Sequence, residues 1–589
     1  MIPEPASQPE GRFYRQDTTS AKWIRDLKNI ILISPAKESV KDTFNVVSDN
    51  EQYRMMQGRT ISRIRVIRLD PFGSDIDAQD IDTHPDKISF LERAGNAVHI
   101  TTREFVIRNA LYFHEGDTVN ALKLADSERY LRSLHYINDA RISALPIGEQ
   151  EAEIVVITQD VLPYGVDLST NLSSKGNFAL SDRNIFGWGF DIKAGVFMDT
   201  KRTEKWGYEV DASMRNIARS HISIDAIYRN RFKNEKTGVV LNRDFYTPST
   251  KYAGNLTVYK EQMEMNYAPD SSYSLINPVL VRLRYSDGWI GRSFLISGNA
   301  PGVMQNNITV ALRAQKTDFL QRPENSQNLY YLFQNRTVYL ASLSFSRQGY
   351  YKTNLIYNYG RTEDIPRGFL LSVVGGKEHN EQYNRPYVGV NTSMGQFIPW
   401  LGYLSGSAAY GTFLYEKRPQ QGSLDFAVNY FSNLFVTGSF KQRFFANMQI
   451  SRQLDTQNLD YMKINGDTGI PGFRNDSVYG RRRLNLSMEH NLFAPWDVYG
   501  FRMVWYAFAN FSWLGGYDSP VLERTLYTSF GCGIRIRNNR FIINTIQLQF
   551  AYFPYIPANS RFDYFTLSKE TLLNPRNFSS KAPEIIKLY

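Results

Sequence analysis

Most of this chain alternates between apolar and polar residues with a period of two. From Tyr164 to the end of the chain the pattern returns in one segment after another. Clear examples are Tyr208–Met214, Ile222–Tyr228, Tyr339–Ser346, Leu484–Glu489 and Ile546–Tyr552. Successive side chains of a strand point to opposite faces of its sheet. The sequence therefore predicts an all-β region with one apolar and one polar face.

Two architectures share this alternation. The apolar face of a soluble sandwich points into a packed core, whereas that of an outer-membrane barrel points outward to lipid. Strands here often end in aromatic residues, as at Trp188, Trp206 and Trp289, and long polar connections follow, such as 317–335 and 454–476. Interfacial aromatic girdles and long loops on one side favour the membrane barrel. Soluble β-rich modules remain the alternative.

Composition narrows the classes further. The 589 residues are 42% hydrophobic and 14% aromatic, which is too apolar for a disordered chain. No uninterrupted apolar run approaches the ~18 residues of a membrane-spanning helix. The single cysteine, Cys532, cannot form an intrachain disulfide. The net charge of +10 is interspersed with acids, so we expect no nucleic-acid partner. The start Met1–Pro5 is not a signal peptide, so we expect a cytoplasmic protein or a mature form.

A smaller region of mixed pattern precedes the strands. Residues 1–58 are predicted to be a tail with a short helix around Ala21–Leu32, and residues 59–161 a small α+β domain. Arg63–Val66 alternates as a strand does, and Thr101–Glu104 has capping-box spacing before a helix. A second helix fits Leu122–Tyr136. Two further strands fit 140–145 and 152–158.

The order strand, helix, helix, strand, strand resembles a POTRA domain, the polypeptide-transport-associated module. Ser181–Gly189 is similar to the "DxNLFGxG" stretch at the first hairpin of the BamA superfamily, and Asp467–Arg474 lies where that family carries (V/I)RG(F/Y). The resemblance implies a transmembrane antiparallel β-barrel of about 16 strands over 162–573, five of them after this motif, with a C-terminal extension over 574–589. It also implies that the motif folds back into the barrel lumen.

The candidate site residues of the loop follow from the same resemblance. They are Gly469, Ile470, Pro471, Gly472, Phe473 and Arg474. Pro471 replaces the arginine of the family motif, and Asn510 stands where the family has its aspartate partner. The candidate partners within the lumen are Glu489 and Asn510, and we hypothesise a substitute ion pair between Arg474 and Glu489.

The resemblance also implies a function. A barrel of this family closes by pairing its first strand, here 164–173, with its last, here 561–569; the seam residues are Tyr164, Gly165, Val166, Phe562, Tyr564 and Thr566. A weakly paired seam offers free backbone groups to an incoming strand. The predicted function is to assist insertion, assembly or translocation of polypeptides at the outer membrane of a Gram-negative cell. The small domain would lie in the periplasm and offer edge strands near 61–69 and 153–157.

The predicted partners are the lipid bilayer and nascent outer-membrane or exported polypeptides, with accessory lipoproteins or other barrels as further candidates. The alternative is a passive porin-like channel or a structural subunit of a larger complex. An enzyme is not predicted, since the seven histidines show no HxxxH or HxH pairing and no GxSxG is present. No catalytic residue, metal ligand or cofactor is expected.

Overall fold

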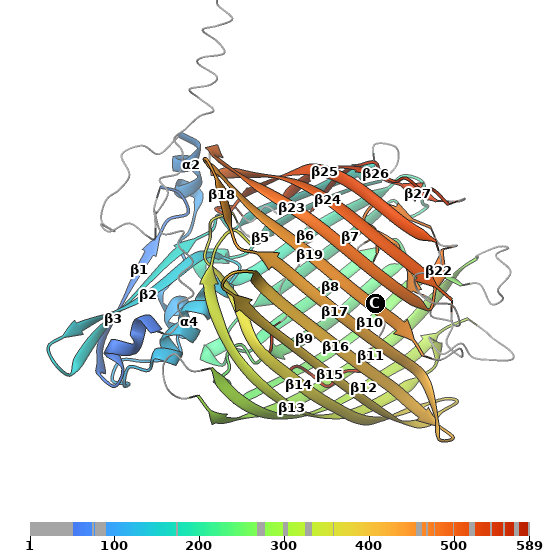
Figure 1. The fold of residues 1–589 in the computed structure, drawn as a ribbon, viewed down its shortest axis with the longest axis horizontal. Helices are drawn as coiled ribbons and strands as arrows, with labels where there is room; N and C mark the ends of the chain where they lie inside the picture. Colours follow the sequence, from blue (N-terminus) through green and yellow to red (C-terminus); the bar gives the residue numbers. More distant parts are fainter. Residues whose placement is uncertain are drawn as a thin grey trace, which may run out of the picture.

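The computed structural model of this chain describes residues 51–73, 76, 90–171, 175–267, 277–298, 304–323, 333–356, 359–454, 462–466, 469–475, 478–498, 500–516, 525–541, 545–557, 560–569 and 577–586. A small mixed domain stands at one end of a large curled sheet (Figure 1). The helix expected at 21–32 and the motif residues Asp467 and Thr468 lie outside the described residues.

The small domain is built from one 3₁₀ helix, three α-helices and three strands. They are η1 Glu51–Met56, β1 Thr60–Leu69, α2 Phe90–Val98, α3 Glu104–Asn109, α4 Ala121–Ser133, β2 Ile137–Ile147 and β3 Glu151–Asp160. The strands form one sheet in the order β1-β3-β2, with β1 parallel and β2 antiparallel to β3. The expected strands at both ends of the domain and the helix near 122–136 are present.

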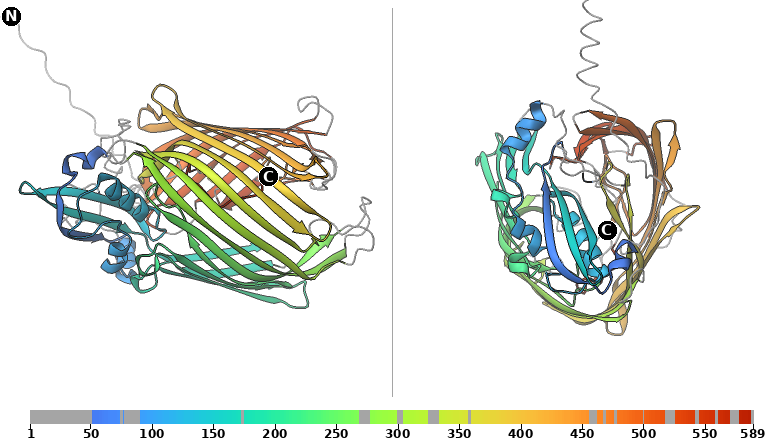
Figure 2. Two further views of the ribbon diagram at one scale, coloured as in Figure 1. Left: turned by 90° about the horizontal axis from the view of Figure 1, so that it is seen from below. Right: turned by 90° about the vertical axis from the view of Figure 1, so that its left-hand side faces the viewer.

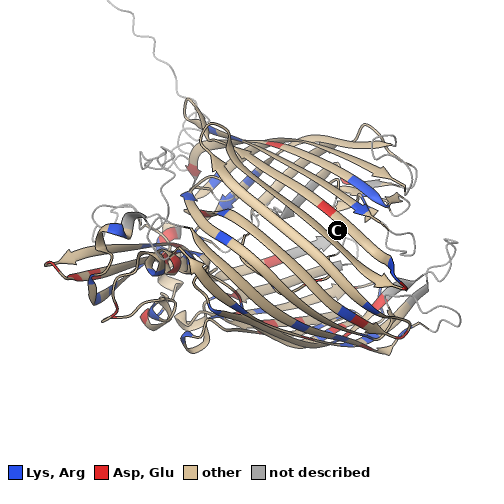
Figure 3. Ribbon diagram, turned by 60° about the horizontal axis from the view of Figure 1, so that its bottom comes forward, with Lys and Arg blue, Asp and Glu red and all other residues tan. Residues whose placement is uncertain are grey.

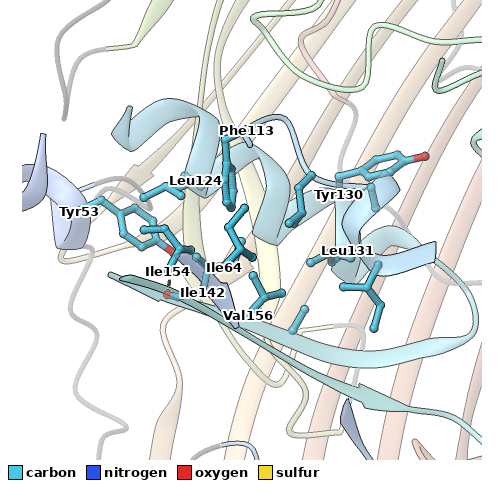
Figure 4. Close-up of a cluster of buried hydrophobic side chains, with 14 of the residues drawn as sticks. Tyr53, Ile64, Phe113, Leu124, Tyr130, Leu131, Ile142, Ile154 and Val156 are labelled. Carbon is cyan, nitrogen blue, oxygen red and sulfur yellow. Dashed lines mark hydrogen bonds between the residues drawn. The ribbon is translucent and has the colours of Figure 1, made fainter. Parts of the chain in front are cut away.

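The domain has its own apolar core between α4 and the sheet. Leu124 and Leu131 of α4 pack with Ile64, Ile142 and other buried side chains of the three strands (Figure 4). Tyr53 of η1 belongs to this core, although it precedes the boundary expected at residue 59. The side chains buried between the helix and the sheet therefore hold η1 to the domain.

Helix α3 begins at Glu104, as expected, but the capping box does not form, because the N-cap residue is Arg103, whose side chain makes no capping hydrogen bond. Helix α2 was not predicted. The expectation for the edges of the sheet is wrong. Residues 153–157 belong to β3, which is the central strand of the sheet, so the two edges are β1 and β2.

The remaining long strands form a single antiparallel sheet. Its members are β4 Tyr164–Asn171, β5 Lys175–Asp182, β6 Phe190–Asp199, β7 Trp206–Met214, β8 Ser223–Arg231, β9 Asn234–Arg243, β10 Tyr252–Tyr267, β11 Asn277–Ser297, β12 Gln305–Gln321, β13 Arg336–Thr353, β14 Glu363–Asn380, β15 Asn384–Ile398, β16 Gly402–Tyr415, β17 Arg418–Ser432, β18 Phe435–Thr437, β19 Phe440–Gln453, β23 Arg482–Val498, β24 Phe501–Gly515, β25 Leu526–Asn538, β26 Ile546–Tyr552 and β28 Phe565–Lys569. The sheet curls round into a barrel, so that its last strand, β28, comes next to its first strand, β4, in the strand order.

These 21 strand segments of the described residues exceed the 16 strands expected. β18 runs in the same direction as β17 and pairs with the same neighbour, β19, so it continues that strand. The excess lies before the loop motif. The five strands expected after it are all present as β23, β24, β25, β26 and β28.

The alternation in the sequence separates the outer from the inner face of this sheet. On β13 the side chains of Tyr339 and Leu343 are each 58% exposed on the outside, whereas Ser344 is 2% exposed and faces inward. The prediction of one apolar and one polar face is confirmed. A soluble sandwich would bury the apolar face of these strands. The exposed apolar side chains of β13 therefore exclude a soluble sandwich for this part of the sheet.

The small domain covers one mouth of the barrel. Seen along the barrel, its three-stranded sheet lies across the ring of strands (Figure 2, right). Acidic and basic residues lie close together where the domain meets the barrel (Figure 3). We call this mouth the domain-side mouth and the opposite one the far mouth.

Candidate functional site

The strands that meet at the seam are much shorter than those on the opposite wall. β28 has 5 residues, β26 has 7, and β4 and β5 have 8 each, whereas β11, β13 and β14 have 21, 18 and 18. Tyr164 and Val166 of β4 have exposed side chains, and Gly165 stands opposite Ser181 of β5. Short strands form few ladder hydrogen bonds, so among the described strands the backbone pairing is weakest on this side of the barrel.

The last strand begins later than expected. Phe562 lies in a separate short strand, β27 Arg561–Phe562, which does not join the barrel wall. The Tyr564 carbonyl accepts from the Ala551 N–H at 2.9 Å, and Thr566 of β28 pairs with Gln549 of β26. The region expected as one strand over 561–569 is therefore divided between the wall and the loop.

The loop motif makes a tight turn. Pro471 and Gly472 are its two central residues, Gly472 has φ +82°, and the Phe473 N–H donates to the Ile470 carbonyl at 3.1 Å. Proline in the second position and glycine with positive φ in the third are typical of a type II turn. Pro471 thus shapes the backbone of this turn.

The turn attaches the loop to the last part of the barrel. β21 Phe473–Arg474 pairs with β27, and the Asp563 N–H donates to the Gly472 carbonyl at 3.0 Å. Ile470 and Phe473 are each 1% exposed in an apolar cluster that includes Leu514 and Phe553, at the far ends of β24 and β26. The loop is thereby fixed at the far mouth, directly before the last strand.

The hypothesised pair between Arg474 and Glu489 is wrong. Arg474 Nη2 lies 3.6 Å from Asp563 Oδ2, and both side chains are largely exposed. Glu489 of β23 instead receives two hydrogen bonds from Arg535 of β25, at 2.6 and 2.7 Å. Asn510 donates to the Ser529 hydroxyl at 3.1 Å. Alternation along β25 places Arg535 on the inner face with Gly533 and Arg537, and this is the signal in the sequence that points to Arg535.

The first-hairpin motif has a structural role that the sequence did not indicate. It forms the turn between β5 and β6, with η2 Ile185–Gly187. Asn184 donates to the Thr102 hydroxyl at 2.8 Å, and the Arg103 N–H donates to the Gly187 carbonyl at 2.9 Å. This turn joins the barrel to the small domain on the seam side.

Buried charges join the same domain to the long-stranded wall. Arg132 of α4 makes two bonds to Asp364 of β14, at 2.6 and 2.9 Å, and also pairs with Glu128. Lys352 of β13 pairs with Glu128. Burial acts to raise the pKa of Glu128, but the charges of Arg132 and Lys352 hold that pKa at about 2. The carboxylate is therefore ionised at any physiological pH.

Nothing among the described residues resembles a metal centre, since no group of three or more His, Cys, Asp or Glu side chains is placed to hold a metal ion. Within the same residues, no helix is long and apolar enough to cross a membrane.

The chain is similar to solved structures of two proteins, BamA and CdiB. BamA from Haemophilus ducreyi lacking POTRA domains 1–3 matches over 86% of this chain and 84% of that chain, with 11% identity and a TM-score of 0.31. CdiB from Acinetobacter baumannii matches over 87% and 72%, with 12% identity and a TM-score of 0.38. CdiB from Escherichia coli matches over 87% and 75%, with 11% identity and a TM-score of 0.40. No family model and no curated sequence matches the chain.

Proposed function

We propose that this chain is an outer-membrane β-barrel protein that assists the insertion, assembly or translocation of polypeptides. The observation that carries the proposal is the barrel itself, apolar outside and polar inside, with its shortest strands at the seam. Strands that cross a bilayer need about 9–11 residues. β11 to β14 exceed this length, with 17 to 21 residues, while β26 and β28 fall short with 7 and 5.

The seam supplies a physical route for this activity. A strand of five residues cannot pair fully with β4, which leaves backbone donors and acceptors at the edge of the sheet. An incoming strand can satisfy them by β-augmentation, without a nucleotide or cofactor. The POTRA-like domain, on the periplasmic side in this proposal, would present the edges of β1 and β2 to the same polypeptides or to accessory proteins. No catalytic residue is needed.

A reversible cross-link of the seam tests the proposal. In a Cys532→Ser background, a cysteine at Val166 is combined in turn with cysteines at Thr566, Leu567 and Ser568, and the pair that oxidises is retained. The matched control is Ser344→Cys with Ser372→Cys, because these residues face each other across β13 and β14 with their hydroxyls 2.9 Å apart.

Insertion of barrel proteins into liposomes is then measured before and after reduction. We expect the seam cross-link to abolish insertion, reduction to restore it, and the control cross-link to have no effect. Full activity with the seam cross-linked would refute the lateral route. Conductance in planar bilayers tests the alternative of a passive channel, which predicts a large, steady current.

A further inference from the structure

The C-terminal segment returns into the barrel after the last strand. Residues 577–586, which we call the tail, contact side chains of the inner face on β12, β13, β15, β16 and β17. These strands lie on the wall opposite the seam. Asn577 contacts Gln348 and Tyr350 near the domain-side mouth, and Ile586 contacts Ser423 on β17.

The wall binds the main chain of the tail through side chains. Arg313 donates to the Pro583 carbonyl at 2.9 Å, and two further bonds join Ile586 to the wall: its N–H donates to the Tyr387 hydroxyl at 2.8 Å, and its carbonyl accepts from Ser423 at 2.9 Å. Asp287 holds the Arg313 guanidinium by two bonds of 2.8 and 2.9 Å. Backbone groups occur in every polypeptide, so this recognition does not depend on one sequence.

Two apolar side chains anchor the tail. Phe578 is 1% exposed and lies against Gly395 of β15, where an added Cβ would stand 2.5 Å from its ring. Seven residues later, Ile585 packs on a luminal cluster of Val338, Leu340, Val374, Tyr387 and Phe413. Elsewhere on β13 and β14 the inner face carries serines, such as Ser344 and Ser372. The apolar cluster would face water if the tail left it.

We propose that this wall is a binding track for an extended polypeptide and that the tail is its resident occupant. The partner is an extended segment with an aromatic anchor and a branched aliphatic residue about seven positions further on. The track continues at the domain side into a cavity of about 760 Å³ lined by Arg129, Tyr350, Arg361 and tail residues. A polypeptide entering past the domain would therefore meet the Phe578 end first. The identity of that partner as a transport substrate rests on the proposed function, but occupancy of the track does not.

A peptide added in trans tests the track. The chain is shortened to residues 1–576, and a fluorescent peptide with the sequence of residues 577–589 is titrated in detergent micelles by anisotropy. A tethered segment has an effective concentration of about millimolar, so the peptide should bind the shortened chain at least tenfold more tightly than the full chain. A peptide with Phe578→Ala should bind at least fivefold more weakly, and a scrambled peptide, which keeps the backbone groups but misplaces both anchors, should bind more weakly still.

A second variant keeps the full chain, in case the shortened chain does not fold. A Cβ built on Gly411 lies 3.1 Å from the Ile586 Cβ and 2.2 Å from the Tyr387 hydroxyl, so Gly411→Cys and Ile586→Cys are combined with Tyr387→Phe and Cys532→Ser. Cysteines at this spacing are close enough to form a disulfide. Oxidation should abolish peptide binding and reduction should restore it.

Equal binding of the peptide to the full and shortened chains, or to the oxidised and reduced forms of the cysteine variant, would refute the proposed binding track. These titrations contain no substrate and no membrane insertion. A chain that binds the peptide but fails to insert barrels would therefore refute the proposed function and leave the track standing.

Discussion

The two halves of the barrel differ in the length of their strands and in the number of other parts of the chain that contact them. The wall of β11 to β14 has strands of 17 to 21 residues, is braced at the domain-side mouth by buried charges and carries the tail on its inner face. The seam half ends in strands of five to eight residues, and its loop holds the connection before β28. We infer that the long wall is the rigid part and that the seam half is where the sheet can open.

The largest expected effect concerns the brace on the long wall. Asp364→Ala removes one of the two carboxylates that pair with the buried Arg132 and leaves Arg132 and Lys352 to share Glu128. Breaking a buried pair in this way costs about 3–5 kcal/mol of the unfolding free energy. Urea unfolding in micelles measures it. The control is Asp318→Ala on β12, whose pair with Lys316 is exposed and is worth about 0–1 kcal/mol. Equal effects of the two changes would contradict a special role for the brace.

The same brace gives a dependence on pH. The pKa of Glu128 is about 2 when folded and about 4.5 otherwise, so its ion pairs contribute fully above pH 4.5. That contribution is lost as the pH falls from 4.5 toward 2. In Glu128→Gln, the unfolding free energy should depend less steeply on pH between 4.5 and 2. An unchanged dependence on pH would show that other carboxyl groups dominate it.

The next largest difference between the two halves should be the cost of placing a charge on the lipid-facing surface. Leu343→Arg places a charge near the middle of β13 on the outer face, which costs about 2–4 kcal/mol at the bilayer midplane. Phe550→Arg, on the seven-residue β26, should cost less, about 0–1 kcal/mol, because a short strand keeps its residues near the interface. Unfolding from lipid vesicles measures both. Equal costs would mean that the bilayer has the same thickness on both sides.

A smaller effect concerns the luminal charges of the seam half. Arg535→Leu removes two charged hydrogen bonds to Glu489 and should cost about 1.5–3 kcal/mol. Arg474→Ala affects an exposed pair and should cost about 0–1 kcal/mol. Unfolding of the double variant Arg474→Ala, Glu489→Ala should show additive effects, since these residues do not touch. A coupling above 0.5 kcal/mol would restore the rejected pair.

The smallest effect lies in the turn between β7 and β8. His221 stacks on Tyr112 of the domain at 4.5 Å, and burial, with the charge of Arg243, lowers its pKa to about 4. The histidine is neutral when folded, so stability from this contact falls as the pH drops from 6.5 toward 4. His221→Phe should keep the stacking and lose the pH dependence. Trypsin cleavage of the domain at pH 5 and pH 7.5 would detect the difference.

Local chemistry made much of this fold predictable. Alternation located most strands of the sheet, including the five after the loop. Each strand has one polar and one apolar face, so its pattern is visible without knowledge of its neighbours. Turn chemistry was equally local, as Pro471 and Gly472 show. The strand number before the loop was underestimated, because the 16 strands expected came from the resemblance and not from the alternation.

Contacts between residues far apart in the chain could not be predicted from the sequence. Arg132 and Asp364 are 232 residues apart, and the tail meets strands more than 160 residues earlier. Only the curl of the sheet brings these groups together. Arg535 could have been placed on the inner face by parity, but its choice of Glu489 depends on the register of β23, β24 and β25.

The last strand is held at both of its ends. Its first residue follows the short strand that pairs with the loop, and seven residues of chain join its last residue, Lys569, to the tail, a reach of at most about 25–30 Å. The loop therefore adjoins this strand at one mouth, and the tail is tethered to it at the other. If displacing the tail shifts the equilibrium of the seam, thermodynamic linkage requires that a seam ligand shift the binding of the tail by the same free energy.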